Sequence, residues 1–259
     1  MHGCPGGPRR ALGVPDVAEI VVTAVMLLVG STVASTVGFG IGLTTIPVLL
    51  LVLDPQTTVV VVNTVSLLLF GAIAVQARRS ISLRTMAPVC AAGLAGVPVG
   101  VFFLNSVNEG ALRIGIAALI IVLTFTFAID LDISALRSRV AGPVAGFAAS
   151  VLITASGIGG PLLALYLLAQ GWPRHSVRGS LALFFLVIES TAAVGYVATG
   201  IFDLERLVLT SVAAVPVLIG SGLGAVVASR MNETVFRYAA MTMIVTASVV
   251  VLAREAIAF

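Results

Sequence analysis

Two glycine-rich stretches are the part of this chain best suited to bind a ligand. They read VGFGIGLTTIP at residues 37–47 and GIGGP at residues 157–161, and each precedes a short apolar helix expected over 44–53 or 161–170. About ten helical residues rise roughly 15 Å, half of a bilayer core of about 30 Å, so each short helix goes only part-way across. A helix that begins at such a break presents unpaired N–H groups and a partial positive charge, which suit an anion.

The residues expected to contact this anion are the glycines of both breaks and the hydrogen-bond donors near them. Arg178, about five residues into a helix expected over 176–200, either supplies a fixed positive charge that matches an oxyanion or reaches back to the membrane surface. Hydroxyl groups in membrane helices often bond their own backbone, and glycines often serve close helix packing, so each residue also has a structural interpretation. The candidate substrate-binding residues are Gly38, Gly40, Gly42, Thr44, Thr45, Asn63, Thr64, Gly157, Gly159, Gly160, Arg178 and Ser180.

Glu189 is the candidate proton-coupling residue. It lies in LALFFLVIES, near the middle of the same expected helix and so close to the bilayer midplane. An acidic side chain at that depth is costly and is interpreted as functional by default, here as a group that exchanges a proton during transport. The alternative is a neutral acid that only bonds to a neighbouring helix. The aligned first-half position is Ile73 or a neighbour, so the group occurs once.

The composition predicts an all-α, polytopic transmembrane bundle. Of the 259 residues, 59% are hydrophobic and 10% are charged, against about 25% charged in soluble domains, and the mean hydropathy is +1.17. Apolar runs long enough to approach a membrane span occur at residues 17–37, 57–77, 86–104, 110–129, 140–156, 178–200, 207–229 and 234–252. The first run is expected to be a retained helix rather than a signal peptide.

The ionisable residues are too sparse to predict an enzyme, a metal site or a cofactor. The chain has two cysteines and two histidines, no cluster of such residues lies within the spans, and no Walker motif occurs. Its 14 basic residues are all arginines and sit mostly in short loops, which is typical of a membrane protein and not of a nucleic-acid surface.

The chain is predicted to be a tandem duplication. Residues 96–113 and 220–237 share glycine, Asn-Glu and arginine at a constant spacing, and Gly40-Ile41-Gly42 aligns with Gly157-Ile158-Gly159. The predicted organisation is a disordered tail over 1–15, a first transmembrane repeat over 16–130, a polar linker over 131–139 and a second repeat over 140–259. If each half crosses an odd number of times the repeats are inverted, and if each crosses four times they are parallel. For the inverted and the parallel arrangement alike, the positive-inside rule places nine arginines in the cytoplasm and five outside, so it does not separate them. The half-length helices favour inversion.

Several stretches resemble the TauE/SafE sulfite exporter family. They are the Gly-x-Gly break with its apolar half-helix, RRSISLR after the next helix, and GIGGPLLALYLLAQGWPRHSVRGSLALFFLVIE in the second half. The resemblance covers nearly the whole chain, although GFGIGLTTIP departs from the usual run of three glycines. It implies transport of a small sulfur-containing anion, such as sulfite or a sulfonate, without ATP hydrolysis.

The sequence therefore favours a secondary transporter of a small anion, most consistent with export of sulfite or an organosulfonate coupled to a proton or ion gradient. A membrane scaffold without transport and an intramembrane enzyme are the two alternatives. The expected location is the plasma membrane, and the expected partners are the anion, membrane lipid and no nucleic acid, with a homodimer left open.

Overall fold

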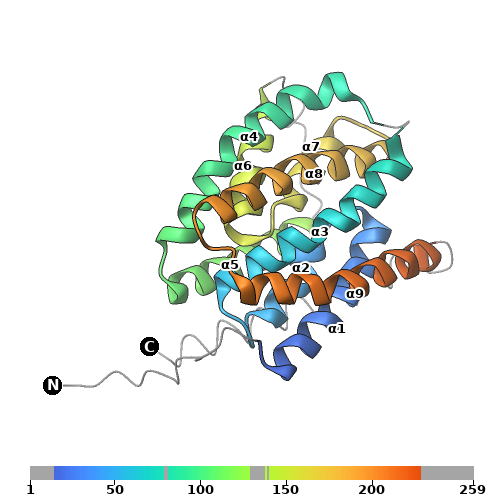
Figure 1. Ribbon diagram of the computed structural model, residues 1–259. Helices are drawn as coiled ribbons and strands as arrows, with labels where there is room; N and C mark the ends of the chain where they lie inside the picture. The colour runs from blue at the N-terminus through green and yellow to red at the C-terminus, as the bar shows by residue number, and fades with distance from the viewer. Residues whose placement is uncertain (1–14, 79–80, 129–137, 139, 229–259) are drawn as a thin grey trace.

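The structure, a computed structural model, describes residues 15–78, 81–128, 138 and 140–228 (Figure 1). Within these ranges the chain forms helices and no strands, which confirms the all-α prediction. The helices of this part are α1 (Val17–Val37), α2 (Ile41–Leu49), α3 (Pro55–Ala77), α4 (Leu83–Ser106), α5 (Glu109–Ala128), α6 (Ala141–Ser156), α7 (Gly160–Ala169), α8 (Arg174–Ala198) and α9 (Leu204–Ala228). Nearly all of the predicted tail and linker, and the last predicted apolar run (234–252), lie outside the described residues.

Helix ends follow local capping chemistry. Asp16 and Glu19 form a reciprocal capping box at the start of α1, and Asp54 accepts a hydrogen bond from the Thr57 backbone N–H at the start of α3 (2.8 Å). Helices α1 and α6 end at Gly38 and Gly157, whose φ angles of 97° and 71° lie in the left-handed region that favours glycine. The other seven predicted apolar runs coincide with helices to within about four residues at each end.

The first short helix lies earlier in the chain than predicted. Helix α2 spans Ile41–Leu49 rather than 44–53, because Gly40, with a φ of 104°, ends the break immediately before Ile41. Residues 50–53 form turns instead of continuing the helix, closed by bonds such as Leu53 N–H to the Leu49 carbonyl (2.7 Å). Helix α7 spans Gly160–Ala169, one residue from its prediction. Both short helices thus begin directly at their glycine breaks.

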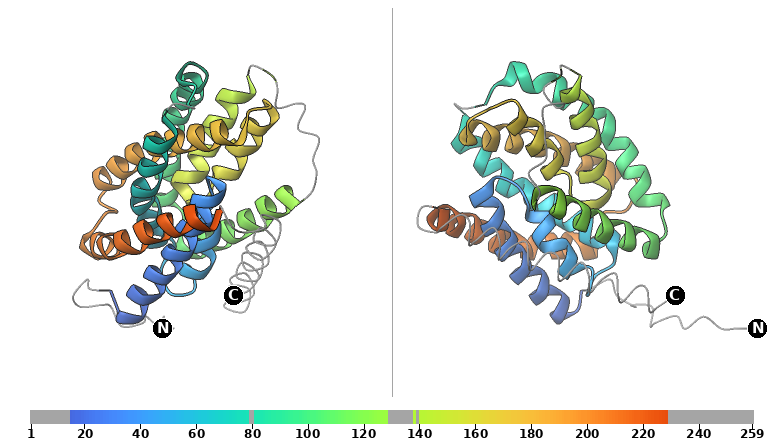
Figure 2. Two further views of the ribbon diagram at one scale, coloured as in Figure 1. Left: turned by 90° about the vertical axis from the view of Figure 1, so that its right-hand side faces the viewer. Right: turned by 180° about the vertical axis from the view of Figure 1, so that it is seen from behind.

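Helices from the two halves of the chain interlock. Helix α1 packs along α9, α4 packs along α6, and α3 crosses α8 at the centre, while α2 lies against α1 and α7 against α6 (Figures 1 and 2). Helix α3 is the most enclosed of the long apolar helices, and its Val59–Val62 run is almost fully buried. The breaks between α1 and α2 and between α6 and α7 are therefore held inside the bundle.

The outward faces of the described helices are apolar. Val75, Phe102, Val194 and Val215 each expose more than 60% of their surface, and five of the described helices are long and apolar enough to cross a membrane. They are Val17–Thr36, Pro55–Ala77, Leu83–Ser106, His175–Ala198 and Leu204–Val226 within their helices. Exposed valine and phenylalanine on helices of this length are suited to lipid contact.

One arginine ties three helix ends together. The Arg206 Nε donates to Thr57 Oγ1 (3.0 Å), its guanidinium lies 3.8 Å from carboxylate oxygens of Asp54 and Asp203, and it also donates to the Ile201 carbonyl. The side chain is 11% exposed. These contacts fasten the start of α9 and the α8–α9 turn to the start of α3, just after the first short helix.

Candidate functional site

The two glycine breaks, far apart in the sequence, lie against each other. A Cβ atom on Gly42 would overlap the carbonyl oxygen of Gly157, and Gly157 is in turn covered by the Ile46 side chain of α2. A Cβ on Gly160 would lie 3.1 Å from Phe39 Cβ, in the first break. The N-termini of α2 and α7 therefore meet in the interior of the bundle, and neither has a side-chain cap among the described residues.

Different glycines of the breaks are required for different reasons. Gly38, Gly40 and Gly157 adopt positive φ angles, which L side chains rarely adopt. Gly42 and Gly159 have no such angle, but a Cβ on Gly159 would overlap the Ala149 carbonyl oxygen as one on Gly42 overlaps that of Gly157. For Gly42 and Gly159, close approach of a neighbouring backbone is the constraint.

The backbone also changes how the two breaks correspond. Gly38 and Gly157 both end a long helix in the left-handed conformation, and Gly40 and Gly159 both immediately precede a short helix. By their helix ends Gly40 compares with Gly159, whereas the sequence alignment pairs Gly40 with Gly157. A Gly-Ile-Gly triplet occurs in both breaks. It starts two residues after the end of α1 in the first break but directly at the end of α6 in the second, so the triplet alone does not show where each helix ends.

The predicted threonine donors bond to their own helices. Thr44 Oγ1 donates to the Gly40 or Ile41 carbonyl (both 3.0 Å), Thr45 Oγ1 to the Ile41 carbonyl (2.7 Å), and Thr64 Oγ1 to the Val60 carbonyl (2.7 Å). Each hydroxyl has one hydrogen to donate, so these three have none left for an anion in this conformation. Ser180 differs, because its fully buried hydroxyl has no hydrogen-bond partner among the described residues.

Asn63 joins the two halves at the second break. Its Nδ2 donates both to the Ile153 carbonyl (2.8 Å) and to the Tyr196 hydroxyl (2.9 Å), and the Tyr196 hydroxyl donates to the Thr154 carbonyl (2.8 Å). Ile153 and Thr154 are in the last turn of α6, where helix carbonyls lack partners within the helix. Both amide hydrogens of Asn63 are thus used to hold the end of α6 rather than to face a ligand.

Glu189 sits at the crossing of α3 and α8. Its side chain is 2% exposed, and its Oε2 lies 2.7 Å from the Ser66 hydroxyl oxygen. Between Asn63 and Ser66 the partner on α8 changes from Tyr196 to Glu189, so the two helices run antiparallel where they cross. Sequence reasoning missed both Ser66 and Tyr196. The available signal was spacing: Ser66 follows Asn63 by three residues and Tyr196 follows Glu189 by seven, so each pair shares a helix face.

Arg178 lies beside the first break, although it belongs to the second half. A Cβ on Gly38 would lie 3.0 Å from Arg178 Cγ, so the arginine stem packs against this glycine. The side chain is half-buried, and its Nε is enclosed with no hydrogen-bond partner among the described residues. Arg178 therefore contacts the break of the opposite half, because α8 crosses the bundle toward the end of α1.

Aromatic rings form one wall of the breaks. Phe185 Cζ would lie 2.8 Å from a Cβ on Gly160, and the Phe185 ring stacks on Phe70 with centroids 4.2 Å apart and planes 4° apart. These rings exclude water from one side of the α7 N-terminus. Because the local dielectric is lower without water, the backbone N–H groups there interact more strongly with a charge.

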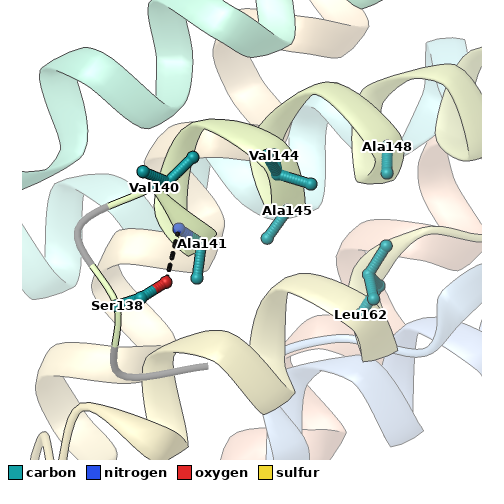
Figure 3. Close-up of a pocket in the computed structure, with 7 residues that line it drawn as sticks. All are labelled: Ser138, Val140, Ala141, Val144, Ala145, Ala148 and Leu162. Carbon is teal, nitrogen blue, oxygen red and sulfur yellow. Dashed lines mark hydrogen bonds between the residues drawn. The ribbon is translucent and has the colours of Figure 1, made fainter. Parts of the chain in front are cut away.

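An apolar pocket lies between the first half of α6 and the start of α7. It has a volume of about 310 Å³ beside the first half of α6, and its lining residues are Ser138, Val140, Ala141, Val144, Ala145, Ala148 and Leu162 (Figure 3). Its single polar side chain, Ser138, accepts a hydrogen bond from the Ala141 backbone N–H (3.2 Å). Because its lining carries no cationic group, this pocket is unsuited to an anion. Among the described residues, no group of three or more metal-binding side chains occurs either.

Comparison with known proteins identifies the family. The family model described as Sulfite exporter TauE/SafE matches residues 22–251. The chain belongs to this family. No curated protein and no solved structure matches it. Membership over nearly the whole chain confirms the resemblance predicted from the GIGGP and RGSLALFFL stretches. Together with the five long apolar helices, it makes this member of the TauE/SafE family a multi-pass membrane protein of a transporter family rather than of an enzyme family.

Proposed function

We propose that this TauE/SafE protein is a secondary transporter of a small anion, with sulfite or an organosulfonate as the substrate and export across the plasma membrane as the direction. The observation that carries the proposal is the contact between the two breaks, which brings the N-termini of α2 and α7 together inside the bundle. Two such N-termini contribute about half a positive charge each, and breaks of this kind at corresponding positions are typical of transporter sites. The family's description supports the choice of sulfur oxyanions.

Inverted repeats are part of the same proposal. Gly96 on α4 faces the Phe147 carbonyl and Ser150 of α6. Gly220 on α9 faces the Leu28 carbonyl and Ser31 of α1 in the same way, so the α4–α6 and α1–α9 pairs make equivalent contacts. The antiparallel crossing of α3 and α8 supports inversion rather than a parallel repeat, since equivalent helices in parallel repeats would run the same way. Inversion selects the topology in which both termini lie outside the cell.

At the crossing of α3 and α8, the proposed repeat pairs Ser66 with Phe185 and Phe70 with Glu189. The Ser66–Glu189 hydrogen bond therefore corresponds to the Phe70–Phe185 stack. Phe70, rather than Ile73, then takes the position of Glu189 in the first half. The proton-binding group exists once, and the equivalent place is filled by an aromatic ring, so a single carboxyl serves the coupling to a proton gradient.

Flux measured with purified protein in liposomes tests the function directly. We expect uptake or release of radiolabelled sulfite or a small sulfonate to exceed that of protein-free liposomes and to respond to an imposed pH gradient. A membrane scaffold would give no flux, and an intramembrane enzyme would convert the anion chemically instead of moving it. Flux of neither anion above the protein-free level would overturn the proposal.

Arg178→Ala is expected to weaken binding of a doubly charged anion more than that of a singly charged one. Two helix N-termini supply about one positive charge together, enough for a monoanion but short for sulfite as a dianion. The Arg178 guanidinium, whose stem packs on Gly38, would supply the remainder. Arg178→Lys should restore binding only in part, because an ammonium group cannot donate the paired bonds of a guanidinium.

Competition of sulfite and of a monoanionic sulfonate against a labelled anion measures this selectivity in the parent and both variants. Arg84→Ala is the matched control, since Arg84 is an exposed arginine at the start of α4 and should leave both affinities unchanged. Equal losses for the two anions in Arg178→Ala, or no loss, would place Arg178 outside the site.

A further inference from the structure

Two sets of hydrogen bonds that meet in Asn63 join Glu189 to the second glycine break: one reaches the Asn63 backbone carbonyl, and the other starts at its side-chain amide. Glu189 Oε2 lies 2.7 Å from Ser66 Oγ, Ser66 Oγ lies 3.0 Å from the Asn63 carbonyl oxygen, and the Asn63 amide donates to the Ile153 carbonyl (2.8 Å). The Ile153 carbonyl also accepts the backbone N–H of Gly157 (2.8 Å). The chain therefore starts at a carboxyl group on α8, passes through α3 and ends on the backbone where α6 stops.

The Ser66 hydroxyl can respond to the charge of Glu189. It has one hydrogen and two oxygen neighbours, the carboxyl of Glu189 and the carbonyl of Asn63. A protonated Glu189 can donate to Ser66 Oγ while Ser66 donates to the Asn63 carbonyl. An ionised carboxylate only accepts, so Ser66 must turn its hydrogen toward Glu189 and leave that carbonyl. All three residues are at most 2% exposed, so water does not replace the lost bond.

A second branch reaches the same helix end through Tyr196. Its hydroxyl accepts a hydrogen bond from the Asn63 amide (2.9 Å) and donates one to the Thr154 carbonyl (2.8 Å). Tyr196 lies two helical turns beyond Glu189 on the same face of α8. Asn63 and Tyr196 together hold two carbonyl groups of the last turn of α6, those of Ile153 and Thr154, so a shift at Ser66 is passed to the backbone of the break.

Few other ionisable groups lie on α8 or on the described helices that pack against it. The described side chains of α3 and α6, which pack against α8, include no ionisable group, and Tyr196 lies on α8 itself, seven residues after Glu189. The remaining ionisable side chains on α8 and on the other helices packed against it are Arg84 and Cys90 on α4, Tyr166 on α7, and Arg174, His175 and Arg178 at the start of α8. Apart from Arg174, whose side chain lies outside the described part of the structure, none of these forms a hydrogen bond or an ion pair with Glu189.

We propose that Ser66, Asn63 and Tyr196 are positioning residues that transmit the protonation state of Glu189 to the glycine break at Gly157. The inference rests on the proposed transport function, whose anion site includes the α7 N-terminus that follows this break. In the step itself, a carboxylate takes one proton from the aqueous phase and becomes a carboxylic acid, and Ser66 changes its acceptor. Because Glu189 is buried here, this exchange with water belongs to another conformation of the transport cycle.

Hydrogen–deuterium exchange of the full-length protein in lipid nanodiscs tests the coupling without requiring transport. The readout is exchange of the peptide covering 153–163, compared at mildly acidic and mildly alkaline pH after correction for the intrinsic chemical rate. In the parent we expect the corrected exchange rate at alkaline pH to exceed the corrected rate at acidic pH by at least about fivefold, the lower end of typical coupling between sites. Glu189→Gln should show equal corrected exchange at both pH values.

Ser66→Ala and Tyr196→Phe should each lose the excess exchange, and the second variant keeps the test decisive if the first fails to insert. Thr191→Val is the matched control, because it removes a hydroxyl on α8 that only donates to the Val187 carbonyl (2.8 Å), and it should retain the excess. An excess of parental size in Ser66→Ala, or none in the parent, would overturn the inference.

Sulfite flux of the same preparations separates this inference from the proposed function. If the parent protein shows the pH-dependent exchange but no flux, the coupling is supported and the proposed transport function is contradicted. If it transports sulfite without the excess exchange, only the coupling is contradicted. If both hold, Ser66→Ala should also flatten the dependence of flux on pH.

Discussion

Gly42→Val and Gly159→Val are each expected to abolish anion transport while leaving membrane insertion largely intact. A side chain on Gly42 would overlap the Gly157 carbonyl oxygen, and one on Gly159 would overlap that of Ala149. Backbone cannot move aside as a flexible side chain can. Gly42→Val must therefore push the two breaks apart, and Gly159→Val must push the second break away from α6. Displacements of about 1 Å at a site can cost on the order of 100-fold in rate, and we expect a flux loss of at least that size.

The control for these variants is Gly222→Val on α9. No atom lies within 4 Å of a Cβ built on Gly222, and the residue is exposed on the outer face of the helix. It should insert and transport as the parent does. Sulfite flux in liposomes, with the yield of inserted protein measured alongside, checks all three variants. Parental flux in both break variants would remove the breaks from the transport site.

Glu189→Gln is expected to fold and insert normally but to lose flux driven by a pH gradient. Glutamine has the shape of the neutral acid and can still bond to the Ser66 hydroxyl, which lies 2.7 Å from Glu189 Oε2. It cannot release a proton, so a proton gradient has no group through which to act. Replacing a buried hydrogen-bonding group by one of similar shape costs little stability, which separates this variant from a general packing defect.

The measurement is sulfite flux with and without an imposed pH gradient. Flux down a sulfite gradient should persist in Glu189→Gln, whereas the stimulation by the pH gradient should fall by at least about fivefold, the lower end of typical coupling. Stimulation equal to that of the parent would assign Glu189 a structural role only.

The sequence by itself determined the class of protein and the location of its helices. Hydrophobic runs of membrane length and the scarcity of charge encode a helical membrane bundle, because backbone polar groups in lipid must bond within their own segment. Glycine and proline encode the breaks just as locally, since Gly38 and Gly157 end helices through their own φ angles. The boundary of α2 was less certain, because a glycine-rich segment can end one helix or begin the next.

Only the tertiary structure decided which residues meet. The contact of Gly42 with Gly157, the packing of Arg178 on Gly38 and the bonds of Ser66 to Glu189 all join the two halves of the chain. Helical periodicity fixes which residues share a face of one helix, but not which other helix that face contacts. The hydrogen bonds of Asn63 and the threonines could not be predicted for the same reason, because the sequence does not show whether a donor already bonds to a backbone carbonyl.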